Sequence, residues 1–161
     1  MRRLAATAIA AVAALAAAAS APASSSSSVA ALQVALRAQG HYQAPVDGIR
    51  GPLTVAALRA FKRSSGVQER ALGASTRRAL GQLGAPLLGQ RELAAGAVGW
   101  DVSSLEFRLV GHGLPARAVD GRFTEETTAA LRRFQRASGL IPDGIAGVQT
   151  FRALARPAPA R

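Results

Sequence analysis

Two histidines, His41 and His112, and nine acidic side chains are the groups of this 161-residue chain that could hold a metal ion or transfer protons. A zinc peptidase or amidase needs three His, Asp or Glu ligands around an open coordination position. The chain has no H-x-H or H-E-x-x-H spacing, no cysteine and no nucleophile elbow. We therefore expect no catalytic residue, no metal ligand and no cofactor.

The charge of the chain is strongly positive. Twenty Lys and Arg residues, of which only Lys62 is a lysine, face the nine acids and give a formal net charge of +11. A surface of this sign attracts anionic partners. Composition alone leaves open whether the partner is a nucleic acid, an acidic polymer or a membrane surface.

The first 23 residues are predicted to be a signal peptide. Arg2 and Arg3 precede 16 uncharged, Ala-rich residues, and Ala21-Pro22-Ala23 has the small-x-small pattern of a cleavage site. The apolar stretch is shorter than the ~20 residues that span a membrane. We expect a secreted protein of the cell wall or periplasm, with no stable membrane anchor. Export also favours a wall polymer over nucleic acid as the anionic partner.

The rest of the chain is an internal duplication. Shifted by 73 positions, residues 29–72 align with residues 102–145 without a gap, and 16 of the 44 pairs are identical. Two copies of this length indicate tandem domains rather than a solenoid. The predicted order is signal peptide 1–23, Ser-rich linker 24–28, module 1 at 29–84, linker 85–98, module 2 at 99–156 and Pro/Ala tail 157–161.

Each copy is predicted to form three helices. Val29, Leu32 and Leu36 recur at the spacing of one helical face, and module 2 repeats this pattern. Ser28 and Asp101 are the expected N-caps of the first helices, and Pro52 and Thr124 mark the starts of the second helices. The third helices are expected near residues 75–83 and 148–155. With no strand pattern longer than a few residues, the predicted class is all-α.

Several residues are expected to serve the fold. Phe61, Phe134 and Phe151 have helical spacing and are predicted core residues. Trp100 stands at the junction of the copies and is predicted to pack the two modules together. The Asp-Gly pairs are predicted turns, because Asp accepts hydrogen bonds from nearby backbone N–H groups and Gly adopts positive φ. Ligand contact is the alternative for these turns.

Copy two resembles the peptidoglycan-binding domain of bacterial cell-wall hydrolases, a small three-helix module. The residues that carry the resemblance are Val102, Leu105, Gly113, Asp120-Gly121, Thr127, Ala130-Leu131, Phe134-Gln135, Gly139-Leu140, Asp143-Gly144, Gly147, Thr150 and Leu154. Copy one keeps the first half of the motif but has Lys62 for the usual Gln and Arg70-Ala71 for the second Asp-Gly. Copy two has Glu106 for the usual Gln of the first helix. The missing second Asp-Gly predicts that copy one binds more weakly.

The resemblance implies a secreted, monomeric, non-catalytic protein that binds peptidoglycan through two tandem modules. The alternative is the targeting half of a peptidase, amidase or glycosidase whose catalytic domain is absent from this chain, which the Pro/Ala tail keeps open. A basic helical nucleic-acid binder is a third reading, disfavoured by the leader. The candidate ligand-binding residues are Tyr42, Asp47, Arg50, Asp120, Arg122, Arg132, Gln135 and Asp143.

Overall fold

The fold is all-α, as predicted. The computed structural model describes residues 25–156, and within this range it contains no strand, only two isolated bridges, Leu93–Ala146 and Val98–Arg122. The predicted signal peptide and tail lie outside the described residues. The elements are α1 (Ser27–Ala38), α2 (Pro52–Ser64), α3 (Ala74–Ala79), the 3-10 helix η1 (Gly81–Gly84), α4 (Trp100–Gly111), α5 (Glu125–Ala137) and α6 (Val148–Leu154).

Each module buries its own hydrophobic core. In module 1, Leu32 and Leu36 of α1 pack against Leu58 and Phe61 of α2. In module 2, Phe134 of α5 lies in the core with residues of α4 and α6, and the partly buried Phe151 packs against this core. The predicted core roles of the three phenylalanines are thereby confirmed. Leu93, from the segment predicted as a linker, is fully buried in the second core.

The helix ends follow the predictions in part. Pro52 opens α2, and the Thr124 side chain accepts a hydrogen bond from the Thr127 N–H at the start of α5. The predicted N-caps of the first helices are wrong. Helix α1 begins at Ser27 with Ser26 as its N-cap, inside the segment predicted as a Ser-rich linker. Helix α4 begins at Trp100, so Asp101 lies in its first turn, buried and paired with Arg91.

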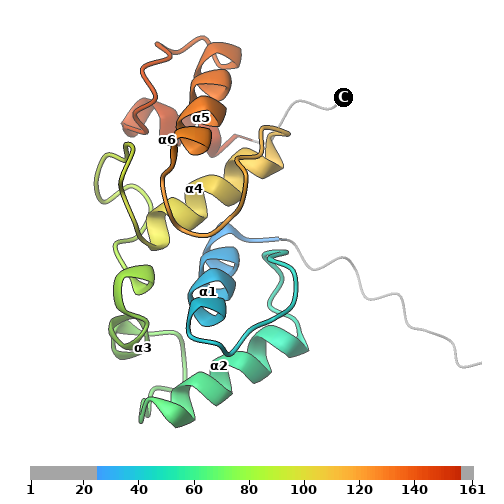
Figure 1. The fold of residues 1–161 in the computed structure, drawn as a ribbon. Coiled ribbons are helices and arrows are strands. Elements are labelled where there is room, and N and C mark those ends of the chain that lie inside the picture. The colour runs from blue at the N-terminus through green and yellow to red at the C-terminus, as the bar shows by residue number, and fades with distance from the viewer. Residues whose placement is uncertain (1–24, 157–161) are drawn as a thin grey trace, which may run out of the picture.

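The two modules meet along α1 and α4, which lie next to each other in the middle of the molecule, with α2 and α5 toward opposite ends (Figure 1). Trp100, on α4 of module 2, is 1% exposed and belongs to the core of module 1. Its predicted role in packing the modules together is confirmed. Two hydrogen bonds cross the same seam. The Ser104 hydroxyl donates to the Ser27 carbonyl (3.3 Å), and Arg108 Nε donates to Ser27 Oγ (3.2 Å).

The Asp-Gly turns of the two modules also line this seam. Gly48 has φ +70°, and a Cβ atom added there would lie 2.6 Å from the Phe107 ring of the other module. A Cβ atom at Gly121 would lie 2.6 Å from Leu83 Cδ2. Both positions therefore require glycine for conformation and for space. The two turns therefore pack closely against the opposite module as well as joining helices.

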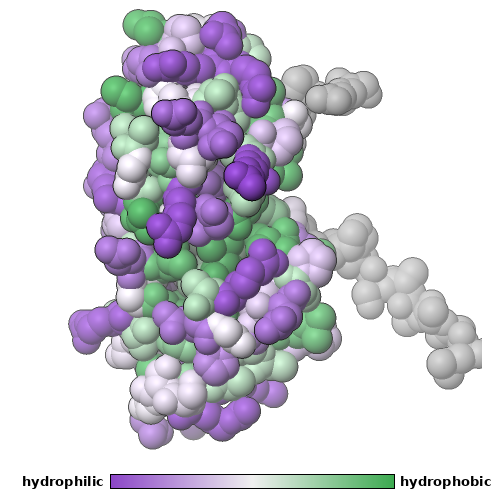
Figure 2. Space-filling model, viewed as in Figure 1, coloured by the Kyte–Doolittle hydropathy of each residue, from purple (hydrophilic) through white to green (hydrophobic). Residues whose placement is uncertain are grey.

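The distribution of hydrophobic and hydrophilic residues on the surface follows the arrangement of the two modules. On the face shown in Figure 2, hydrophobic residues gather where the modules meet, and hydrophilic residues dominate toward both ends. Among residues 25–156, no helix has the length and apolar content needed to cross a membrane.

Candidate functional site

The first Asp-Gly turn of module 1 is held by a side chain of α1. The Gln33 Oε1 atom accepts the N–H groups of Asp47 (3.1 Å) and Gly48 (2.9 Å). Its Nε2 atom donates to Asp47 Oδ1 (2.6 Å), the Ile49 carbonyl (3.1 Å) and Thr54 Oγ1 (3.0 Å). Gln33 is fully buried, so these bonds satisfy an amide that has no access to water. We call this arrangement a turn clamp: one helix side chain that holds an Asp-Gly turn and a threonine of the next helix.

Module 2 repeats the clamp at its second turn. Gln135 of α5 accepts the Gly144 N–H (2.9 Å) and donates to Asp143 Oδ1 (2.8 Å) and Thr150 Oγ1 (3.3 Å). The Ile145 N–H and the Gln135 amide together lower the pKa of Asp143. Gln135 is 1% exposed. Its amide is thus occupied by partners within the module.

The first clamp of module 2 carries a carboxyl group instead of an amide. Glu106 Oε2 accepts the N–H groups of Asp120 (3.0 Å) and Gly121 (2.9 Å), as Gln33 Oε1 does in module 1. Its Oε1 atom faces the Thr127 hydroxyl (3.3 Å). This oxygen occupies the place of the Gln33 nitrogen, which donates to the aspartate of the turn. An ionised carboxylate has no proton to donate there.

Burial and the neighbouring negative charge therefore act together on Glu106. The side chain is 1% exposed. Burial is the main cause that raises its pKa to about 7, and Asp120 raises it further against the hydrogen bonds from Gly121, Asp120 and Thr127. Arg117, Arg122 and Glu126 line the same small pocket of about 180 Å³. Protonation of Glu106 supplies one O–H donor where Gln33 supplies its amide nitrogen.

The second turn of module 1 is held differently, because Lys62 replaces the glutamine. Its Nζ atom donates to the carbonyls of Glu69 (2.8 Å) and Ala71 (2.6 Å). The Glu69 carboxylate accepts the N–H groups of Ser75 and Thr76 (both 2.9 Å) and the Thr76 hydroxyl (2.8 Å). These donors lower the pKa of Glu69 to about 2. The second turn of module 1 is thus held by the Lys62 ammonium group, where module 2 uses the Gln135 amide.

Sequence reasoning missed the clamps, although the sequence contains a signal for them. Asp47, Asp120 and Asp143 are each followed by Gly and, seven positions after the aspartate, by a threonine. That spacing places the threonine in the first turn of the next helix, within reach of the clamp side chain. The observed hydrogen bonds confirm the turn interpretation of the three Asp-Gly pairs.

The predicted ligand-binding residues do not converge on one site. Tyr42 is 4% exposed in the core of module 1, and its hydroxyl donates to the Pro45 carbonyl (2.8 Å). Arg122 is exposed beside Asp120. Arg132 Nη2 donates to the Asp143 carbonyl (3.3 Å), which places it next to Gln135. Arg50 is exposed on a separate pocket of module 1. Ligand contact by these residues stays a prediction.

Comparison with known proteins supplies the family. The family described as a peptidoglycan binding domain matches residues 25–80 and again residues 99–154. The two matches cover both modules and most of the chain. The chain belongs to the peptidoglycan-binding domain family.

Individual relatives match these peptidoglycan-binding modules. The chain is 40% identical over 126 residues to the N-acetylmuramoyl-L-alanine amidase CwlM of Mycobacterium tuberculosis, covering 78% of this chain and 26% of the relative. It is 48% identical over 61 residues to the zinc D-Ala-D-Ala carboxypeptidase of Streptomyces albus G, covering 37% of this chain and 24% of the relative. The chain thus spans about a quarter of the length of these curated relatives.

One solved structure matches part of the chain. The crystal structure of the SleB N-terminal domain is 39% identical, with 43% of this chain and 94% of that chain covered and a TM-score of 0.42.

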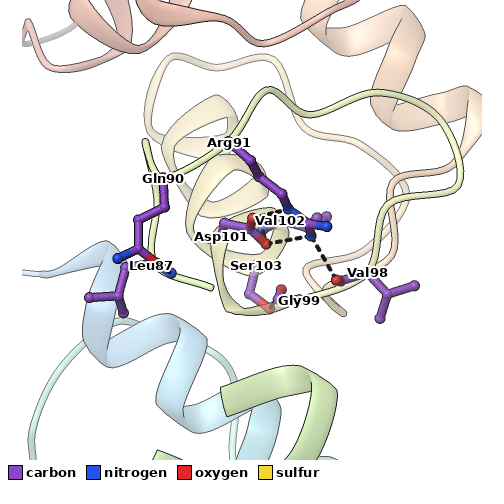
Figure 3. A network of polar contacts seen from close by, with 8 residues as sticks. All are labelled: Leu87, Gln90, Arg91, Val98, Gly99, Asp101, Val102 and Ser103. Atoms are coloured by element: carbon purple, nitrogen blue, oxygen red, sulfur yellow. Dashed lines mark hydrogen bonds and ion pairs between the residues drawn. The ribbon is translucent and has the colours of Figure 1, made fainter. Parts of the chain in front are cut away.

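The segment before the second peptidoglycan-binding module is fixed by an ion pair that sequence reasoning missed. Arg91 Nε lies 2.7 Å from Asp101 Oδ2, and its Nη2 donates to Asp101 Oδ1 (3.2 Å) and to the Val98 carbonyl (2.9 Å; Figure 3). The hydrogen bond with Asp101 raises the pKa of Arg91. Because the Asp101 side chain is 1% exposed, removing Arg91 would leave a buried charge without its partner.

The two histidines make similar ring contacts although they occupy different positions of the repeat. The rings of His41 and His112 each pack edge-on against the phenylalanine of the second helix, Phe61 at 5.7 Å and Phe134 at 4.9 Å between centroids. His41 Nε2 also contacts Ser64 Oγ (3.2 Å). Residues 25–156 hold no group of three His, Cys, Asp or Glu side chains placed to bind a metal ion.

The clamps predict unequal costs for two equivalent substitutions. Asp47→Ala should lower the free energy of unfolding by about 1–2 kcal/mol at pH 8, because it removes the hydrogen bonds with Gln33 and Ile49. Asp120→Ala should cost clearly less, because it also removes a negative charge that faces Glu106. Urea denaturation of both variants measures the difference. Equal losses at pH 8 would show that Asp120 and Glu106 do not oppose each other.

Proposed function

We propose that this chain binds bacterial peptidoglycan through its two modules and does not cleave it. The observation that carries the proposal is the double family match, which covers both modules. The matched parts of the amidase and the carboxypeptidase are about a quarter of each enzyme. The similarity therefore supports a binding role and gives no support for a reaction in this chain. A secreted protein of the cell wall or periplasm fits the Ala-rich leader and the wall enzymes among the relatives.

The charge distribution supports an anionic wall polymer as the partner. The carboxyl groups of Asp47, Glu69, Asp101, Glu106 and Asp143 are all engaged by hydrogen bonds within the fold. In the described part of the chain, Arg91–Asp101 is the one ion pair. Most arginines are thus left to meet external anions, such as the carboxylates of wall peptides.

The test is co-sedimentation of the full chain with purified, insoluble peptidoglycan, with chitin and DNA-cellulose as matched insoluble controls. Retention on peptidoglycan alone is expected. Raising the salt from about 0.1 to about 1 M, which shortens the Debye length from ~10 to ~3 Å, should weaken this retention without abolishing it. Equal retention on DNA-cellulose, or complete loss at high salt, would reduce the binding to non-specific charge.

The same samples address catalysis. Soluble fragments released from the wall should not exceed those released by a heat-denatured control. Release that persists through further purification of the protein would contradict a non-catalytic role.

The alternative is that these modules are the targeting half of a peptidase, amidase or glycosidase of the wall, whose catalytic domain is absent from this chain or encoded downstream of it. The enzymes among the relatives, each about four times as long as the matched segment, favour this alternative over an unrelated function. Reading the gene beyond codon 161 distinguishes the two proposals.

A further inference from the structure

A basic pocket lies on module 1 beside the turn that has lost its aspartate. The pocket has a volume of about 310 Å³ and is bounded by α2 and by the turn that leads to α3. Its charged lining consists of Arg50, Arg59, Lys62, Arg63, Arg70 and one acid, Glu69. We call it the Arg70 pocket. Val55 and the buried Leu58 give it an apolar side.

The single acid does not neutralise the Arg70 pocket. Both carboxylate oxygens of Glu69 accept hydrogen bonds at the start of α3. The Lys62 ammonium group is occupied by two backbone carbonyls. Within residues 25–156, the guanidinium groups of Arg50, Arg59, Arg63 and Arg70 make no hydrogen bond or ion pair with the protein. Four donor-rich cations therefore surround one pocket without a partner.

In module 2, the positions that correspond to the Arg70 pocket carry an intact turn clamp. Gln135 stands at the position of Lys62 and Asp143 at that of Arg70, and the two side chains bond each other. Arg132, which corresponds to Arg59, donates to the Asp143 carbonyl. The pocket on that side is lined by Glu92, Asp143 and exposed apolar side chains. The exchanges of Gln135 for Lys62 and of Asp143 for Arg70 thus make the module 1 pocket three formal charges more positive.

We propose that the Arg70 pocket binds an oxyanion of the cell wall, a carboxylate or a phosphate, and makes module 1 the anion-specific half of the pair. The inference rests on the proposed wall-binding function and deepens it. A guanidinium group binds either oxyanion with two parallel hydrogen bonds, and neighbouring arginines can share a ligand with several oxygens. On this proposal, the residues that replace the second Asp-Gly pair give module 1 an oxyanion-binding site. The sequence alone predicts the opposite, weaker binding by module 1.

The pocket is tested in the full chain with a matched pair of double variants. Arg59→Gln/Arg70→Gln removes two charges from the pocket. Arg133→Gln/Arg152→Gln removes two charges from exposed positions of module 2 that make no hydrogen bonds in the structure. Each protein is sedimented with intact wall and with wall stripped of phosphate polymers by hydrofluoric acid. Thermal unfolding should be unchanged in both variants, because the four arginines are exposed and make no hydrogen bonds with the protein.

The pocket variant should bind wall roughly tenfold more weakly, as expected for loss of one or two charge-assisted hydrogen bonds, and the module 2 variant less than twofold. Weakening on stripped wall identifies the anion as a carboxylate, and weakening confined to intact wall identifies it as phosphate. Equal binding by the two variants would overturn the pocket and leave the wall-binding function intact.

An NMR titration tests anion binding by the Arg70 pocket independently of binding to the wall. The wild-type chain and the pocket variant are titrated with inorganic phosphate and with diacetyl-L-Lys-D-Ala-D-Ala while amide NMR shifts are recorded. Saturable shifts near residues 50, 59–63 and 69–71 in the wild type alone support the pocket even where wall binding itself fails. Identical titrations of the two proteins would overturn it.

Discussion

Replacing Trp100 by alanine should lower the free energy of unfolding by about 3–5 kcal/mol, the usual cost of truncating a large buried aromatic side chain. The side chain is 1% exposed and lies in the core of module 1, although it belongs to α4 of module 2. Its loss leaves a cavity in one module and removes the main apolar anchor of the other. Urea denaturation followed by far-UV circular dichroism measures the effect without relying on the single tryptophan for fluorescence.

The conservative variant Trp100→Phe should recover part of the loss, because the phenyl ring fills part of the same cavity. The wild-type chain should unfold in one transition, since both modules depend on this contact. A loss below about 1 kcal/mol for Trp100→Ala, or two separate wild-type transitions, would show that the modules are energetically independent.

Glu106→Gln should stabilise the protein by up to about 3 kcal/mol at pH 8 and have little effect at pH 4. The folded-state pKa of Glu106, about 7, lies above the ordinary value of 4.5, so the folded protein holds a proton that the unfolded chain releases between these values. The stability that comes from the protonated form is complete below about pH 4.5 and is lost as the pH rises through 7. Glutamine supplies the donor at every pH, as Gln33 does in module 1.

The pH dependence of stability separates this mechanism from simple repacking. The difference in unfolding free energy between wild type and Glu106→Gln should grow between pH 4.5 and 7 and level off above that range. The reciprocal variant Gln33→Glu should introduce the same loss in module 1. Two results would contradict the claim that ionisation of buried Glu106 destabilises the fold. One is a wild-type protein that is as stable at pH 8 as at pH 5. The other is a Glu106→Gln variant that is less stable than the wild type at pH 8.

Local sequence patterns were sufficient to predict the helices and most of the core residues. The periodicity of Leu32 and Leu36, the proline at 52 and the threonine at 124 each act within one or two helical turns, so the sequence alone identifies them. Trp100 was predictable because a single large aromatic residue between two small domains has few other uses. The duplication supported these predictions, since each predicted helix could be compared with its counterpart in the other module.

The missed features depend on residues that are distant in sequence or on choices that local rules leave open. Asp101 satisfies the pattern of an N-cap, but Arg91, ten residues earlier, takes its carboxylate into a buried pair. Tyr42 is a candidate ligand-binding residue by sequence, yet its ring lies in the core of module 1 and its hydroxyl donates to the Pro45 carbonyl. Gln33 reaches a turn 14 residues away. No periodicity specifies such contacts, because they depend on how the helices pack.

Trp100 belongs to module 2 but fills the core of module 1, and this affects whether either module can be lost in evolution. The two repeats share 16 of 44 aligned positions, and a gene that kept one repeat would encode a single module. Module 1 alone would keep a cavity the size of an indole ring, and module 2 alone would expose that ring to water. The shared tryptophan thus penalises the loss of either module.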